Sequence, residues 1–331
     1  MSFPKLLLIL AVTLFTVIGI AAAIKSWRNS APKHEATTEV ASIDVHLDSY
    51  EDDVAPEQTE HTPVFSPAPA PANPDAPLPQ ADRIREFFNK SEPKFPIVLT
   101  VTYKSRVPWQ KGRPAWLSDY ASHYATSRHF IARSLNGKAD YFKQDVGEGD
   151  RFNVLNPDKN INFYLVIDTS RCKMWFYYLD LDSHERVLVK TYDVSLGRID
   201  SKKASGLLTP LGKYTLGSKI AIYKPKLTGF YNGQKIEMIR VFGTRWIPFD
   251  KEIGECTAAP DGLGLHGLPW LPNEKGELTE NRDSLGKYES DGCIRLSTAG
   301  IEELFAIIIT RPTTVELVKD FYDAKLPGVE H

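Results

Sequence analysis

Cys293 and His266 are the two side chains of this 331-residue chain whose surroundings favour nucleophilic catalysis. Cys293 lies in the run SDGCIRL (290–296), just before an expected helix, and His266 lies in GLHGL (264–268). A helix N-terminus and a nearby cation favour the thiolate, which is the nucleophilic form of cysteine. Such a thiol needs a base within hydrogen-bond reach, and His266 is the only histidine between His184 and His331. The same spacing also fits a buried structural thiol and a packed core histidine.

The neighbours of Cys293 suggest how an acyl-transfer site would be completed. Gly292 permits backbone angles at which amide N–H groups converge on one point, as an oxyanion hole requires. Arg295 is able to clamp a carboxylate with two hydrogen bonds. Asp291 opposes ionisation of the adjacent thiol unless Arg295 or solvent offsets its charge.

The remaining candidates for chemistry indicate no second site. Cys172 and Cys256 have no base nearby in the sequence, so we expect core packing or a disulfide between them. His123 and His129 are six positions apart and do not form the i, i+4 pair of a helical metal site. No metal, no organic cofactor and no phosphate-binding loop is implied. A formal net charge of −2 argues against a nucleic-acid partner.

The elements that must position these residues are mostly strands. Apolar runs at 161–168 and 173–180 and the alternating segment 186–197 predict strands, and 209–224 and 237–249 continue in the same style. One helix is expected after Ser297 or Thr298, with Ile301, Leu304, Phe305 and Ile308 on one face. Pro312 ends it, and 313–319 forms a last strand.

The part of the chain before this region divides into three. Residues 6–24 carry no charge and are long enough to span a bilayer as a helix, so we expect 1–28 to be an uncleaved membrane anchor or a cleaved signal segment. Residues 29–82 are acidic and rich in proline, as in an extended linker. Residues 83–158 predict a small α+β module, with a strand at 96–103 and helices at 116–124 and 127–135. From Arg83 onward the formal charge is +5, which suits a carboxylate-rich partner.

Three motifs in order resemble the L,D-transpeptidase (YkuD) family: VSLG (194–197), TPLGKY (209–214), and SDGCIR (290–295) preceded by His266-Gly267. The resemblance covers about 161–319 and implies a catalytic domain at 159–320, followed by a tail at 321–331. It implies a mainly β (α+β) fold, a mixed β-sandwich with one packed helix. Residues 114–155 faintly resemble a LysM carbohydrate-binding module, although a generic packing domain fits them equally.

Carried over residue by residue, the resemblance implies a role for each position of the motif. Cys293 becomes the nucleophile and His266 the general base, and the Gly267 carbonyl orients that base. Ser290 and Gly292 line the nucleophile loop, and Arg295 contacts substrate.

Two features depart from the family pattern. Asp291 stands where many members have a second histidine. Residues 268–289 form a longer interval than usual, which fits either a lid over the cleft or a plain surface insertion.

The implied substrate is the peptidoglycan stem peptide, and the implied location is extracytoplasmic, at the inner membrane or in the periplasm. We expect a thioester enzyme that forms 3→3 cross-links or attaches a wall protein. The alternatives are an L,D-carboxypeptidase, in which water replaces the acceptor amine, and a non-catalytic tether between membrane and peptidoglycan in which Asp291 has silenced the thiol. A cysteine protease unrelated to the wall is remote, because Cys293 lacks a papain-like context.

Overall fold

The computed structural model describes residues 70–71 and 74–331. The predicted anchor at 1–28 and most of the predicted linker lie outside this part. Among the described residues, no helix combines the length and the apolar character that crossing a membrane requires.

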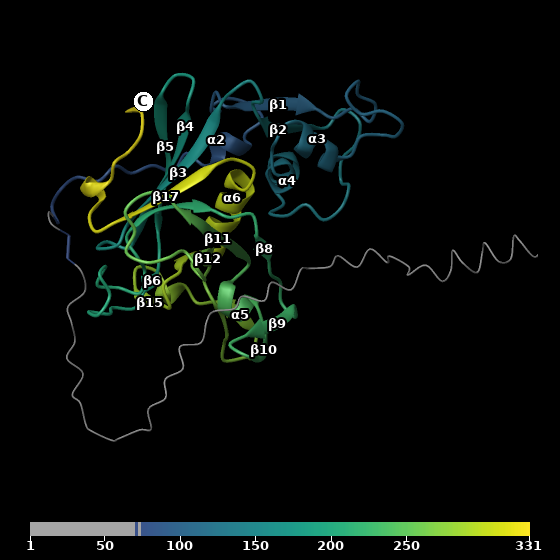
Figure 1. Cartoon of the computed structure of the whole chain (residues 1–331). Helices are drawn as coiled ribbons and strands as arrows, with labels where there is room; N and C mark the ends of the chain where they lie inside the picture. The colour runs from purple at the N-terminus through teal and green to yellow at the C-terminus, as the bar shows by residue number, and fades with distance from the viewer. Residues whose placement is uncertain (1–69, 72–73) are drawn as a thin grey trace, which may run out of the picture. The chain divides into compact units, whose positions relative to one another are not determined.

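A single mixed sheet forms the centre of the described part (Figure 1). In sheet order its strands are β16 (Ile294–Leu296), β12 (Gly264–Gly267), β11 (Arg245–Glu252), β7 (Gly212–Leu216), β17 (Thr313–Val318), β3 (Ile161–Asp168), β4 (Lys173–Asp180), β5 (Glu185–Asp193) and β18 (Val329–Glu330), with β8 (Ala221–Ile222) paired to β11. The pairs β12–β16, β3–β17 and β5–β18 are parallel, and the other pairs are antiparallel. The prediction of a mainly β fold with a mixed sheet is confirmed.

The sheet curls so that its two ends approach each other. Ser195, just beyond β5, exchanges two 2.9 Å backbone hydrogen bonds with Arg295 of β16. The strands are buried on both faces, which explains why β3 and β4 are nearly continuous apolar runs. One face packs on α6 (Thr298–Ile308), whose predicted apolar stripe is fully buried. The Ser297 side chain accepts a 3.1 Å hydrogen bond from Gly300 N and caps this helix, as expected.

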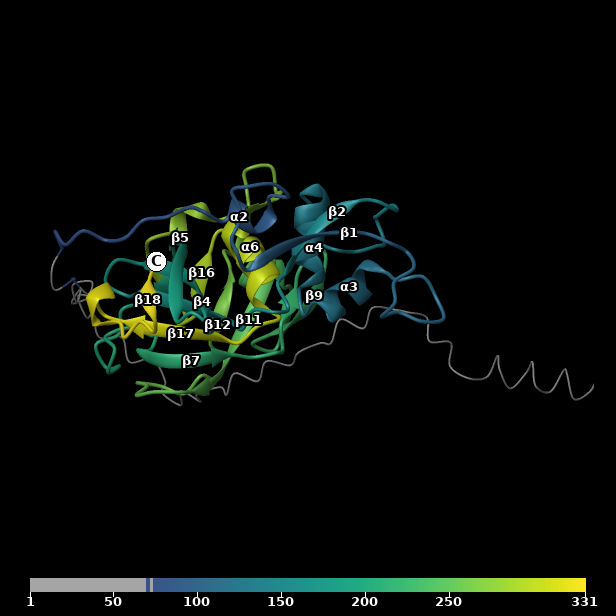
Figure 2. The ribbon, with the colours of Figure 1, turned by 90° about the horizontal axis from the view of Figure 1, so that it is seen from above.

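Residues 83–158 combine short helices with two strands, and their prediction as a separate module stays a prediction. They contain α2 (Arg85–Phe88), β1 (Val98–Thr102), α3 (Leu117–His123), α4 (Arg128–Asn136) and β2 (Arg151–Leu155), with β1 and β2 antiparallel. The module has a small core of its own, but Phe87, Phe95 and Phe130 belong to the same apolar cluster as the large sheet and α6. Figures 1 and 2 both show α4 beside α6. The resemblance of 114–155 to a LysM module stays a prediction.

Short elements complete the part of the chain that follows residue 158. They are β6 (Leu196–Gly197), β9 (Thr228–Tyr231), β10 (Gln234–Glu237), α5 (Ile239–Phe242), β13 (Trp270–Pro272), β14 (Leu278–Glu280), η1 (Arg282–Ser284), β15 (Tyr288–Ser290) and η2 (Phe321–Asp323). The expectation that 237–249 is strand throughout is wrong for 239–242, which is helical. This turn of helix buries both Ile239 and Phe242 and ends at Gly243, whose φ of +61° suits glycine.

Candidate active site

The two chemical motifs come together on neighbouring parallel strands. His266 of β12 pairs with Arg295 of β16, and Leu265 pairs with Ile294. Because side chains alternate along a strand, Leu265 and Ile294 enter the main core, whereas His266 and Arg295 face the opposite side. Cys293 lies two residues before Arg295 and therefore on the same side as the imidazole, one diagonal step away. It packs against a second apolar cluster, which contains Phe242 and Trp246.

His266 is held as a neutral base. Its Nδ1 lies 2.7 Å from the Gly267 carbonyl oxygen, which only accepts hydrogen bonds, so Nδ1 carries the proton and Nε2 is left as the acceptor. The Phe242 ring, 5.4 Å away, meets the imidazole edge-on, and Trp246 lies at 5.9 Å. Burial, assisted by the Arg295 charge, lowers the pKa of His266 from 6.5 to about 3. The orienting role predicted for Gly267 agrees with this contact.

The Cys293 thiol is also neutral at rest. Burial raises its pKa to about 12, against which the Gly264 amide and Arg295 act in the opposite direction. Its Sγ lies 3.5 Å from the Gly262 carbonyl oxygen. Because the thiol and the imidazole are both neutral at rest, attack by this sulfur would require that its proton leave during the attack rather than beforehand.

Arg295 presents unused hydrogen-bonding capacity beside the thiol. Its Nε is buried with no partner, and its Nη1 donates only a 3.5 Å bond to the Glu289 carbonyl. Burial lowers the pKa of this guanidinium. A half-buried, incompletely paired cation favours an incoming carboxylate, because the anion would both neutralise it and satisfy its N–H groups.

Asp291 does not act on the thiol alone. Its exposed carboxylate forms a 2.6 Å ion pair with Arg198, at the end of β6. Asp291 contributes the smallest of the influences on the pKa of Cys293. Arg198 therefore offsets the negative charge of Asp291, a role that the sequence analysis expected of Arg295 or solvent. Arg198 directly follows the VSLG motif, but nothing in the sequence pairs it with Asp291.

The nucleophile loop is fixed by hydrogen bonds from two other motifs. The Thr209 hydroxyl donates to the Gly292 carbonyl at 2.8 Å and accepts from Gly197 N at 2.7 Å. Ser290 Oγ donates to the Cys293 carbonyl at 2.6 Å and accepts from Gly292 N at 3.2 Å. Gly292 has a φ of +121°, which a residue with a Cβ rarely adopts. Its N–H already has an acceptor within the loop, and its predicted place in an oxyanion hole stays a prediction.

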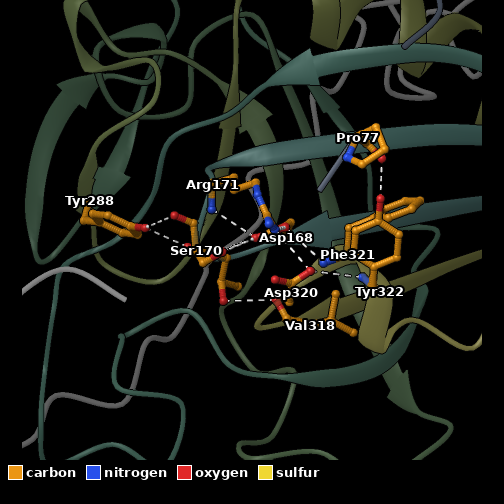
Figure 3. A network of polar contacts seen from close by, with 10 residues as sticks. Pro77, Asp168, Ser170, Arg171, Tyr288, Val318, Asp320, Phe321 and Tyr322 are labelled. Atoms are coloured by element: carbon orange, nitrogen blue, oxygen red, sulfur yellow. Dashed lines mark hydrogen bonds and ion pairs between the residues drawn. The ribbon is translucent and has the colours of Figure 1, made fainter. Parts of the chain in front are cut away.

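A polar network anchors the strand that leads into this loop (Figure 3). Tyr288 of β15 points its hydroxyl to the carbonyls of Thr169 and Ser170, at 2.8 and 3.1 Å. That turn is itself held by the buried carboxylate of Asp168, which accepts from Ser170 N at 2.9 Å and pairs with Arg171. The β3–β4 turn therefore holds β15, the strand that leads into the nucleophile loop, through the Tyr288 hydroxyl.

Two hairpins cover the thiol. The aromatic residues Tyr231 of β9 and Trp270 of β13 pack in the same cluster as Cys293, together with Leu278 of β14. Trp270 and Leu278 belong to the segment 268–289, and the choice between a lid and a plain surface insertion for this segment stays a prediction. The sequence did not predict that the hairpin at 228–237 packs in this cluster, because its short strands show no marked alternation of apolar and polar residues.

The other cysteines take no part in this site. All three cysteines are free thiols, so core packing, not a disulfide, describes Cys172 and Cys256. Burial raises the pKa of Cys172 to about 11. Across residues 70–71 and 74–331, no group of three or more histidine, cysteine and acidic side chains is placed to hold a metal ion.

Comparison with known proteins places this geometry in a family. Residues 162–317 match the model of the L,D-transpeptidase catalytic domain, YkuD. No curated protein matches the chain. Among solved structures it is similar to Bd1075 of Bdellovibrio bacteriovorus, with 16% identity, a TM-score of 0.31, and 48% of each chain covered. It is also similar to the helical cell shape determining protein Pgp2 of Campylobacter jejuni, with 16% identity, a TM-score of 0.31, and 51% of this chain and 50% of that chain covered. The chain thus spans about half the length of these structures.

Proposed function

Because residues 162–317 belong to the YkuD family of L,D-transpeptidase catalytic domains, we propose that the chain transfers a peptidoglycan acyl group through a thioester on Cys293. The observation that carries the proposal is the placement of Cys293 and His266 on one face of adjacent strands, with His266 Nδ1 held by the Gly267 carbonyl. Nε2 is then the only imidazole nitrogen free to accept the thiol proton.

The first half-reaction follows from these protonation states. Sγ forms a bond to the amide carbon between the third stem residue and the terminal D-Ala, while His266 Nε2 takes the proton from sulfur. The C–N bond breaks, His266 returns the proton to the leaving amine, and D-Ala departs. Because both Cys293 and His266 are neutral at rest, the fold does not bear the cost of burying a thiolate or an imidazolium before substrate binds.

Arg295 supplies the recognition element that the proposed substrate requires. A stem peptide carries free carboxylates next to its scissile bond, and the unpaired Nε of Arg295 lies on the same strand face as the thiol. Charge-assisted hydrogen bonds to such a carboxylate would orient the donor peptide over Cys293.

The second half-reaction depends on the acceptor. Attack by an amine from another stem peptide gives a 3→3 cross-link, and attack by a wall protein lysine attaches that protein. Attack by water gives a trimmed stem, which is the L,D-carboxypeptidase outcome. We place this chemistry outside the cytoplasm, with the apolar N-terminal segment as membrane anchor or export signal.

Incubation of the purified full chain with a tetrapeptide muropeptide tests the proposal. Intact-mass spectrometry should detect an acyl-enzyme on Cys293, together with dimers or trimmed monomers. Cys293→Ala should abolish all three, and Cys256→Ala, which removes a half-buried free thiol, should leave them unchanged. Product formation by Cys293→Ala at the parent rate would show that the thiol is not the nucleophile. A chain that binds sacculi but forms no acyl-enzyme would instead be a tether.

A further inference from the structure

A buried arginine connects the N-terminal module to the strand beside the catalytic base. Arg245 begins β11 and is 1% exposed. Its Nη2 pairs with Asp140, which belongs to the segment between α4 and β2 of the module. Its Nη2 also lies 3.7 Å from Glu302 of α6, and its guanidinium lies over the Phe305 ring at 5.3 Å. One side chain therefore joins the module, the sheet and the helix that follows the nucleophile strand.

Further side chains hold the Asp140–Arg245 ion pair in place. His129 Nδ1 of α4 lies 3.4 Å from the carboxylate and accepts a 3.2 Å hydrogen bond from Tyr141 N. Arg133, also on α4, lies 4.0 Å from Glu302 on the far side of Arg245. Despite burial, His129 and Arg245 lower the pKa of Asp140 and keep it ionised. Two carboxylates thus face a fully buried guanidinium from two different elements.

The residues adjoining Arg245 reach the catalytic base directly. The next residue, Trp246, pairs with His266 across β11 and β12. Two residues earlier, Gly243 packs so tightly on the base strand that a Cβ there would stand 2.6 Å from the Gly267 backbone. Gly267 carries the carbonyl that orients His266. A shift of the start of β11 would therefore move both the Trp246 ring, which lies near the His266 imidazole, and the Gly267 carbonyl, which accepts its hydrogen bond.

We propose that Asp140 is a positioning residue for the acyl-transfer site: by holding Arg245 against α6 it fixes the start of β11, and with it the orientation of His266 toward Cys293. The inference rests on the proposed function for its catalytic meaning. It assigns residues 83–158 an indirect part in the reaction, through the positioning of His266, beyond any binding of wall material.

Asp140→Asn, which removes the charge and keeps the shape, is the main test. We expect kcat for a tetrapeptide muropeptide to fall about 10- to 100-fold while KM changes less than twofold, as is typical of a misplaced catalytic group. The rate of Cys293 alkylation by iodoacetamide at pH 7 should fall in parallel, because His266 no longer accepts the thiol proton efficiently. Asp140→Glu should recover most of both rates.

Asp145→Asn is the matched control, since Asp145 lies in the same segment but pairs with Lys138 at the surface. It should leave both rates unchanged. Should Asp140→Asn fail to fold, as judged by thermal melting, Arg245→Lys carries the test, because it retains the charge but loses the planar fork.

Unchanged kcat and alkylation in folded Asp140→Asn, or a loss confined to KM, would overturn the inference. Failure of the proposed function is distinguishable from this result. In that case the parent chain itself would not turn over stem peptides, while the alkylation comparison would still report whether Asp140 governs the Cys293–His266 pair.

Discussion

At the scale of single residues, burial keeps both His266 and Cys293 in their neutral forms. His266 and Cys293 each have a pKa displaced by burial toward the neutral form. Among the described residues, the charges that shift these two pKa values are Arg295, which is incompletely paired, and Asp291, which forms an ion pair with Arg198. In the proposed reaction, charge therefore separates only when substrate is present, and hydrogen-bond donors to the oxyanion together with the Arg295–carboxylate contact would stabilise it.

The depressed pKa of His266 has a measurable consequence for stability. The folded chain holds this imidazole neutral down to about pH 3, whereas an unfolded histidine binds a proton below about 6.5. Between these values the unfolded state binds more protons, so the contribution of His266 to stability is complete above pH 6.5 and is lost as the pH falls toward 3.

We therefore expect His266→Gln to flatten the pH dependence of the unfolding free energy between pH 4 and 6.5, by up to about 1.4 kcal/mol per pH unit. Urea titrations at several pH values would measure this slope. His184→Gln, which alters an exposed histidine, is the control. An equal slope in parent and His266→Gln would mean that the imidazole is not held neutral by the fold.

At the scale of elements, the nucleophile loop depends on strands distant in sequence. The hydroxyl of Thr209, which is fully buried, bridges Gly197 and Gly292 and so joins all three motifs that the sequence resemblance identified. The motifs are separated along the chain but form one hydrogen-bonded unit. Together they hold the loop before Cys293 in a conformation that requires a positive φ at Gly292, which glycine readily adopts.

Thr209→Val tests this unit, because it keeps the shape but leaves a buried N–H and a buried carbonyl unpaired. We expect the unfolding free energy to fall by about 1–3 kcal/mol, and the rate of Cys293 acylation to fall as well. Chemical denaturation and acyl-enzyme formation would measure the two effects. Thr209→Ser retains the hydroxyl and should restore acylation. Full activity in Thr209→Val would show that the loop holds its conformation without this bridge.

Elements with strong local patterns were predictable, and contacts between distant elements were not. The runs at 161–168 and 173–180 match β3 and β4, because a strand buried on both faces requires continuous apolar residues. Of the two N-cap residues that the sequence allowed for α6, Ser297 and Thr298, the structure uses Ser297. The pairs Asp291–Arg198 and Asp140–Arg245 join positions 93 and 105 residues apart, and no local pattern specifies such partners.

At the scale of the whole described part, the module and the catalytic half share one hydrophobic core. The Phe87 ring of the module stacks on Phe176 of β4 at 6.3 Å and meets Phe163 of β3 at 6.4 Å. Phe95 packs edge-on against Tyr178 of β4 at 5.2 Å. Separating residues 83–158 from the sheet would expose both sides of this aromatic contact to water.

This continuity predicts that residues 74–331 unfold in one cooperative transition. Phe87→Ala, in the shared core, should lower the unfolding free energy by about 3–5 kcal/mol without splitting the transition, since both halves lose the same support. Calorimetry and denaturation followed by tryptophan fluorescence would report it. Phe142→Ala removes a module phenylalanine that is 62% exposed and should have little effect. Two separate transitions in the parent chain, only one of them shifted by Phe87→Ala, would mean that the module folds independently and that the catalytic half does not rely on it for support.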